Sequence, residues 1–176
     1  MASIDVGESF GNPQGRARYF TFHQYLSQKY NLSSKALLLA RSRGGLMLYN
    51  WAAEHPAFVA CMAGIYPVCN LSSYPGLHKA SEAYGMTKEQ LEANLSWHNP
   101  VDRLEGLAEE NVPIFFVHGD CDIVVPLEEN SGKLAQRYQQ LGGETRLVTL
   151  KNQGHNMWSG FFQCQQLVDF VIAHSK

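Results

Sequence analysis

A serine, an aspartate and a histidine each follow an apolar run in this sequence, in the chain order nucleophile, acid, base. Ser42 follows "ALLLAR", Asp122 lies just after "VPIFFVHG", and His155 lies just after "TRLVTL". A serine hydroxyl is a weak nucleophile until a base takes its proton and an acid orients that base. Three such residues after three buried strands, in this order, predict an acyl-transfer site of the serine-hydrolase type.

The residues around Ser42 fit a tight turn from a strand into a helix. In such a turn the serine has strained backbone angles, and small residues two before and two after it relieve crowding; Ala40 and Gly44 hold those positions. We expect the backbone N–H of Arg43 to stabilise an oxyanion. The side chains of Arg41 and Arg43 are suited to an anionic substrate, but the interpretation favoured here is that they pair with nearby carboxylates.

Each residue of this set has a simpler explanation when taken alone. Asp120 competes with Asp122, since either aspartate is suited to capping a turn, and a lone histidine such as His155 is most often a loop residue. The pattern around Ser42 also arises by chance. Their joint placement at three strand ends favours catalysis.

Four apolar runs are typical of strands, and the last three are nearly continuous, as parallel strands are when both faces are covered. They lie at residues 36–40, 58–68, 112–119 and 145–150. Helical patterns lie before and between them: from Asn12-Pro13 to Tyr30, over 44–54, around Leu134, Tyr138 and Leu141, and from Phe161 to Ile172. This alternation predicts an α/β fold, a mainly parallel sheet flanked by helices, in one domain over residues 1–176.

Residues 69–110 interrupt the alternation and are rich in Ser, Tyr, Gly and Asn. A Thr87–Gln90 capping box predicts one short helix there. An insertion at a strand end is suited to a lid or pocket wall, and a plain surface excursion is the open alternative. Tyr66, Tyr74 and Trp97 are the aromatic candidates for a substrate pocket.

The composition excludes several classes of protein. A net charge of -2 without a stripe of Lys or Arg argues against a nucleic-acid partner, and no run approaches the roughly 18 apolar residues of a membrane span. The start "MASIDVGESF" is not a signal peptide, and the compartment stays unassigned. The four cysteines lack C-x-x-C spacing, so we expect buried free thiols, and we expect no metal and no organic cofactor.

Five segments together resemble the α/β-hydrolase superfamily, and more narrowly a bacterial esterase-like branch with an S-R-G-G-L elbow. They read "GESFGNPQG", "SRGGLMLYNWAAEHP", "YPVCNLSSYPG", "HGDCDIVVPLEEN" and "GHNMW". The resemblance implies that Ser42 attacks an acyl carbonyl, that His155 moves the proton, and that Asp122 orients His155. It implies a small-molecule ester substrate, such as an esterified carbohydrate. A peptidase or acyltransferase with the same triad stays open.

The chain departs from that superfamily in one respect. Complete domains have several strands before the elbow strand, and a loop after one of them supplies a second oxyanion donor, whereas 41 residues precede Ser42 here. We therefore expect an N-terminally shortened fold in which residues 3–13 are the tail of a strand. An exposed sheet edge would favour a homo-oligomer, or a missing segment, pairing through 3–6 and 37–40. A non-catalytic, hydrolase-like binding protein is the further alternative.

Overall fold

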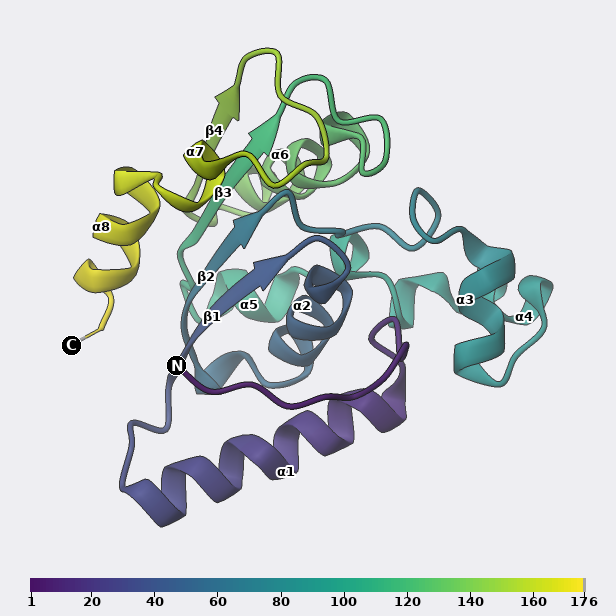
Figure 1. Ribbon diagram of the computed structural model, residues 1–176. Helices are drawn as coiled ribbons and strands as arrows, with labels where there is room; N and C mark the ends of the chain where they lie inside the picture. The colour runs from purple at the N-terminus through teal and green to yellow at the C-terminus, as the bar shows by residue number, and fades with distance from the viewer. Residues whose placement is uncertain (176) are drawn as a thin grey trace.

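One sheet of four parallel strands forms the centre of the computed structural model, which describes residues 1–175 (Figure 1). The strand order is β1-β2-β3-β4, and every neighbouring pair is parallel. The strands are β1 (Ala36–Arg41), β2 (Val59–Ile65), β3 (Ile114–Gly119) and β4 (Thr145–Leu150). The predicted parallel α/β fold is confirmed, because each parallel connection crosses the sheet through helical structure.

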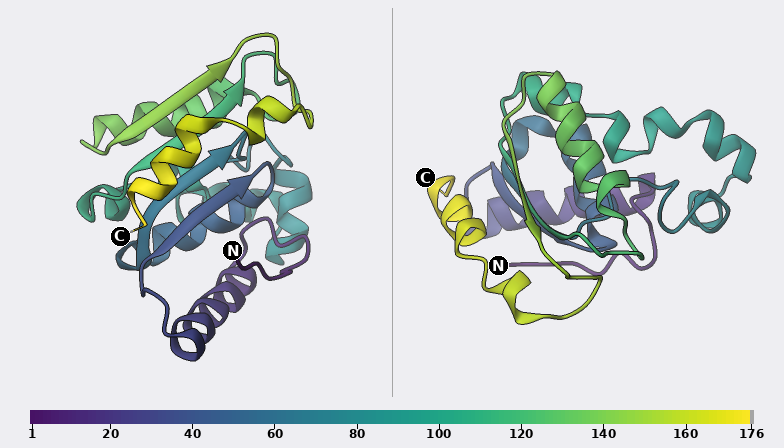
Figure 2. Two further views of the ribbon diagram at one scale, coloured as in Figure 1. Left: turned by 60° about the vertical axis from the view of Figure 1, so that its left-hand side comes forward. Right: turned by 90° about the horizontal axis from the view of Figure 1, so that it is seen from above.

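Helices cover the sheet on both faces. Their bounds are α1 (Pro13–Tyr30), α2 (Gly44–Glu54), α3 (Leu77–Tyr84), α4 (Lys88–Ala93), α5 (Glu105–Glu109), α6 (Ser131–Gln140), α7 (Ser159–Phe162) and α8 (Gln165–Ala173). Single 3₁₀ turns lie at Pro56–Phe58, Leu95–Trp97, Pro100–Asp102 and Leu127–Glu129. α2 and α6 lie on one face and α8 on the other, while α1 packs outside α2 (Figure 2).

The sequence located most helix starts and missed one break. The predicted helix from Asn12-Pro13 begins as α1, because the side chain of Asn12 accepts a hydrogen bond from the Gly15 N–H at 2.8 Å and caps it. The expected single helix from Phe161 to Ile172 is wrong, because the chain leaves α7 and restarts as α8 after an extended Cys164 (ψ 99°). Residues 3–13, expected to be the tail of a strand, form no strand either, and Pro13 already begins α1.

The sheet separates two apolar clusters, because alternate side chains of a strand point to opposite faces. One cluster joins β1, β2 and β3 to α2, α5 and α6 through residues such as Leu38, Trp51 and Tyr138. The other joins β2 and β3 to α7 and α8 through residues such as Phe115 and Phe161. The central strands β2 and β3 therefore have both faces covered, as their continuous apolar runs predicted. The same prediction is wrong for β4, which ends the strand order and has no buried residue. The four cysteines are free thiols, and Cys61 and Cys69 are buried as expected, whereas Cys121 is exposed and Cys164 is half-buried.

Residues 69–110 contain more structure than the one predicted helix. The predicted capping box of Thr87 and Gln90 begins α4, but α3, α5 and two 3₁₀ turns are also present. α3 and α4 form a separate small cluster that projects beyond the sheet (Figures 1 and 2). Asn12 Nδ2 donates to the Ala83 carbonyl at 2.6 Å and anchors this cluster to the start of α1. A lid role for the segment stays a prediction.

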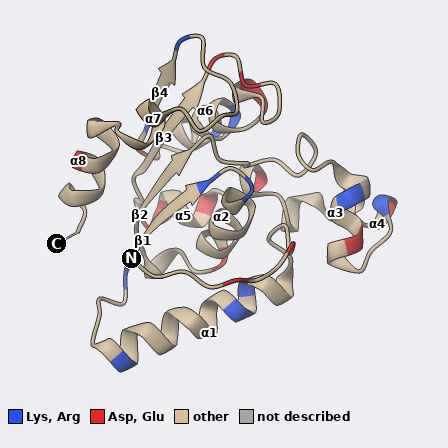
Figure 3. Cartoon of the chain, in the orientation of Figure 1, with Lys and Arg blue, Asp and Glu red and all other residues tan. Residues whose placement is uncertain are grey.

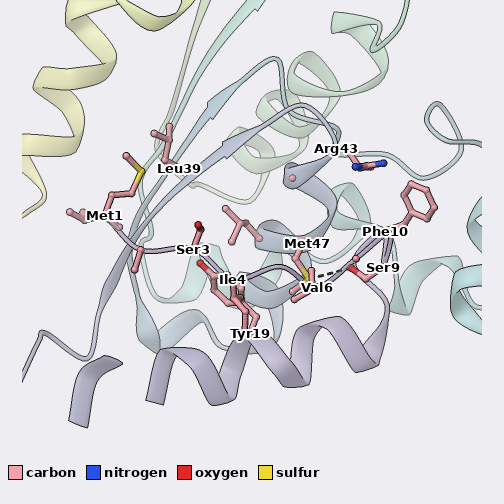
Figure 4. Close-up of a pocket in the computed structure, with 15 residues that line it drawn as sticks. Met1, Ser3, Ile4, Val6, Ser9, Phe10, Tyr19, Leu39, Arg43 and Met47 are labelled. Atoms are coloured by element: carbon pink, nitrogen blue, oxygen red, sulfur yellow. Dashed lines mark hydrogen bonds between the residues drawn. The ribbon is translucent and has the colours of Figure 1, made fainter. Parts of the chain in front are cut away.

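Strand β1 lies at an edge of the sheet. Leu38 and Ala40 are buried under α2, whereas Leu37 and Leu39 on the opposite face are 38% and 44% exposed. Beside them, the N-terminal residues and α2 line an apolar pocket of about 340 Å³, with Leu39 and Met1 at one end and Arg43 and Phe10 at the other (Figure 4). That a second copy or another segment covers this edge stays a prediction.

Charged side chains are spread over most elements and form no single basic stripe (Figure 3). None of the helices within residues 1–175 combines the length and the apolar character that a membrane crossing needs.

Candidate active site

Ser42 lies in the turn between β1 and α2 with a backbone φ of 47°, a left-handed value that non-glycine residues rarely adopt. Three backbone hydrogen bonds hold it there. Its N–H donates to the Ile65 carbonyl at 3.1 Å, and its carbonyl accepts from Gly45 at 3.0 Å and from Val68 at 2.8 Å. The segment that follows β2 therefore fixes the strained turn and presents the serine hydroxyl at the carboxyl edge of the sheet.

The close approach of helix to neighbouring backbone occurs at Gly45, not at Gly44 as the spacing predicted. A Cβ on Gly44 would meet nothing within 4 Å, whereas a Cβ on Gly45 would lie 2.4 Å from the Val68 carbonyl oxygen. Because the second residue of α2 is the one that meets the segment after β2, the glycine that the fold needs is three residues after Ser42.

The three predicted side chains form one hydrogen-bonded line. Ser42 Oγ lies 2.8 Å from His155 Nε2, and His155 Nδ1 lies 2.7 Å from Asp122 Oδ2. The Asp122 side chain is fully buried and that of His155 is 18% exposed. With the proton on Nδ1, His155 donates to the carboxylate and accepts from the serine hydroxyl, which is the tautomer of a general base.

The carboxylate that meets His155 is that of Asp122, whereas Asp120 contacts a different loop. The other carboxylate oxygen of Asp122 accepts from the N–H groups of Val124 at 3.0 Å and Val125 at 2.8 Å. Asp120 Oδ1 instead accepts from the Asn152 N–H at 2.7 Å. Two backbone donors on one oxygen leave the second oxygen of Asp122 directed at His155.

His118, which the sequence reasoning missed, supports the loop that carries Asp122. It is fully buried at the end of β3. Its Nδ1 lies 2.8 Å from Ser131 Oγ, and its Nε2 lies 2.8 Å from the Val125 carbonyl and 3.4 Å from Asp122 Oδ2. A neutral ring donating from Nε2 fits these partners, and burial lowers the His118 pKa. The only sequence signal was a polar residue inside an otherwise apolar strand.

We expect the free energy of unfolding to decrease as the pH falls, because the buried His118 resists protonation. Its folded pKa lies below the ordinary 6.5, so between the two values the unfolded chain binds a proton that the folded chain does not. The stability that neutral His118 contributes is fully present above about pH 6.5 and declines below that pH. His118→Gln should flatten that decline by up to about 1.4 kcal/mol per pH unit, as measured by urea unfolding between pH 5 and 8. Equal slopes in both proteins would contradict this role.

Asn130 is a second supporting residue that the sequence did not reveal. Its Oδ1 accepts from the N–H groups of Cys69 at 2.9 Å and Asn70 at 3.1 Å, and its Nδ2 donates to the Pro126 carbonyl at 3.0 Å. The residue is fully buried. It therefore joins the segment after β2, which holds the Ser42 turn, to the loop that holds Asp122.

The structure brings one of the three aromatic candidates to the site. The Tyr66 ring lies 4.5 Å from the His155 ring, centroid to centroid. Burial raises the pKa of Tyr66, and the charge of Arg41 opposes that rise. Tyr74 packs against the α3–α4 cluster and Trp97 is 70% exposed. Within residues 1–175, neither has a hydrogen bond or ring contact with the three aligned residues.

The arginines on either side of Ser42 differ in their partners. Arg43 Nη1 pairs with Glu8 Oε1 at 2.5 Å, as the favoured interpretation expected. Arg41 forms no ion pair with any residue of 1–175, so that interpretation is wrong for Arg41. The Arg43 backbone N–H has no hydrogen-bond acceptor in the same range and is free for an oxyanion. No group of three or more metal-ligating side chains lies within residues 1–175.

Solved structures with similar folds include peptidases and an esterase. Porphyromonas gingivalis dipeptidyl peptidase 4 matches 90% of this chain with a TM-score of 0.73 and 13% identity. Pyrococcus horikoshii acylaminoacyl peptidase matches 94% of this chain with a TM-score of 0.69 and 17% identity. A truncated carbohydrate esterase from gut microbiota has 0.71 at 15% over 92%. The chain spans 22%, 28% and 67% of those three chains respectively.

At these identities the likeness is one of fold. No curated protein matches the sequence. The profile of the prolyl oligopeptidase family matches residues 19–174, which include the Ser42 turn, the Asp122 loop and the His155 loop. This chain therefore belongs to the prolyl oligopeptidase family, within the α/β-hydrolase superfamily.

Proposed function

We propose that this chain is a serine hydrolase that cleaves carboxylic esters through an acyl-enzyme on Ser42. The observation that carries the proposal is the line of hydrogen bonds from Ser42 Oγ through His155 to Asp122, at 2.8 and 2.7 Å. Nucleophile and base within hydrogen-bond reach, with the base oriented by a third group, are the arrangement that activates a serine. Membership of a hydrolase family supports the same reading.

Each residue of the site has its own step in the proposed reaction. Ser42 Oγ bonds to the carbonyl carbon while its proton passes to His155 Nε2, and Asp122 stabilises the resulting imidazolium. The Arg43 N–H donates to the oxyanion of the tetrahedral intermediate. His155 then gives the proton to the departing alcohol oxygen as that bond breaks. Water attacks the acyl-enzyme by the same route, releasing the acid and restoring Ser42.

A peptidase is the second candidate, because the matched family and two of the similar structures are peptidases. The same residues serve, with an amine nitrogen in place of the alcohol oxygen. A nitrophenyl ester and a nitroanilide of one acyl group separate the two functions. Anilide turnover that Ser42→Ala abolishes would favour the peptidase, and turnover of the ester alone would favour the esterase.

We expect a fluorophosphonate probe to label the wild-type protein at Ser42, because the probe reacts only with a serine that a base has activated. Ser42→Ala and His155→Ala should both lose the label and the turnover of a short-chain nitrophenyl ester. Ser33→Ala, which replaces an exposed serine before β1, is the matched control and should label fully. A folded wild-type protein that takes no label would contradict the proposal and favour the non-catalytic alternative.

A further inference from the structure

Arg41 lies next to the candidate nucleophile on the less covered side of the sheet. It ends β1, where Leu38 and Ala40 face α2, so that Arg41 shares the opposite face with the exposed Leu37 and Leu39. α8 packs on that face over β2 and β3. The side chain of Arg41 is therefore directed toward the loop between β4 and α7, which carries His155.

The contacts of Arg41 are with the neighbours of His155. Its Nη1 donates to Met157 Sδ at 2.9 Å, and the same sulfur accepts from the hydroxyl of Tyr66 at 3.9 Å. The centroid of the Tyr66 ring lies 4.5 Å from that of the His155 ring. A thioether sulfur is a weak acceptor, and a guanidinium carries five N–H donors. Most of the hydrogen-bonding capacity of Arg41 is unused, and its charge has no carboxylate partner within residues 1–175.

The other arginine beside Ser42, Arg43, has a carboxylate partner. Arg43 points to the opposite side of the turn, where Glu8 neutralises it at the end of the apolar pocket (Figure 4). Arg16 and Arg103 likewise pair with Glu54. Arg41 is thus a cation that the fold leaves unpaired on the His155 side of the nucleophile.

We infer that Arg41 selects substrates that carry a carboxylate on the leaving-group side of the scissile ester. The side follows from the mechanism, since the leaving oxygen is the atom that takes its proton from His155 Nε2, and Arg41 contacts the residues that flank His155. A planar guanidinium binds a carboxylate through two parallel hydrogen bonds. Tyr66 and Met157 then form the wall of the leaving-group subsite. The inference rests on the proposed hydrolase function.

The test compares 2-, 3- and 4-acetoxybenzoate with their methyl esters, which place a carboxylate or a neutral group at three distances from one acetyl ester. Arg41→Gln should raise KM for the best of the three anions by about two- to fivefold, as expected for an exposed ion pair, and leave KM for its methyl ester unchanged. Arg41→Lys should restore part of the loss. Arg18→Gln on α1 is the matched control and should change neither substrate.

Equal changes for anion and methyl ester in Arg41→Gln, with all three isomers, would overturn the inference while the hydrolase function stands. If wild type hydrolyses none of the esters, the hydrolase function fails, and the inference is decided by binding. In that case the hydroxybenzoate products and their methyl esters are titrated into wild type and Arg41→Gln by NMR. Weaker binding of the carboxylates alone in the variant supports the subsite, and equal binding overturns it.

Discussion

Asp122→Asn should lower kcat by about ten-thousandfold without unfolding the protein, by analogy with the same change in other serine hydrolases. The reason lies in the two N–H groups of Val124 and Val125 that point at Asp122 Oδ1. An asparagine there must place its carbonyl oxygen against these donors. Its NH₂ group then faces His155 Nδ1 and forces the ring proton onto Nε2, where the ring no longer accepts the proton of Ser42.

Asp120→Asn is the matched control for that experiment. Asp120 lies two residues away, and its Oδ1 accepts from the Asn152 N–H, a bond that an amide oxygen can also accept. We expect kcat within about twofold of wild type, since no reacting group is touched and surface changes of this kind have small effects. Ester turnover and a thermal melt of both variants are the measurements. A large loss in Asp120→Asn with activity kept in Asp122→Asn would reverse the assignment of the acid.

The sequence predicted those features that repeat along the chain or that chemistry demands. The four strands were predicted from apolar runs, and the continuous runs of β2 and β3 belong to strands that are covered on both faces. Ser42, Asp122 and His155 were predicted as a set because parallel strands end at one edge of the sheet, so that residues following β1, β3 and β4 meet there.

Features that depend on how two elements meet were not predictable in the same way. The break at Cys164 was hidden, since apolar residues continue across it from Phe161 to Ile172. His118 looked like an ordinary core residue, and its role follows from the loop that folds back to place the Val125 carbonyl against it. Whether Arg41 finds an acidic partner depends on which residues the fold brings beside it, and one sequence does not contain that information.

Replacing Gly45 with alanine should strongly reduce both stability and activity, because Gly45 is where α2 lies closest to the segment after β2. A Cβ there would lie 2.4 Å from the Val68 carbonyl oxygen and 2.9 Å from the Pro67 Cβ. Gly45→Ala should therefore destabilise the fold by about 3 kcal/mol, as overpacking against atoms that cannot rotate away does. Both are backbone or ring atoms, so relief requires α2 to move.

That movement should also reduce catalysis, because Val68 N–H donates to the Ser42 carbonyl at 2.8 Å and so links the crowded segment to the nucleophile. A shift of about 1 Å at a reacting group costs roughly a hundredfold in rate, and we expect a kcat loss of that order in the Gly45→Ala protein that remains folded. Gly44→Ala is the control, because a Cβ on Gly44 meets nothing within 4 Å. Alanine also stabilises a helix relative to glycine by about 0.5 to 1 kcal/mol. This variant should therefore melt at or above the wild-type temperature. Urea unfolding and ester turnover of Gly45→Ala and Gly44→Ala are the measurements. If Gly44→Ala were the less stable and less active of the two, the position that must be glycine would be the one two residues after Ser42.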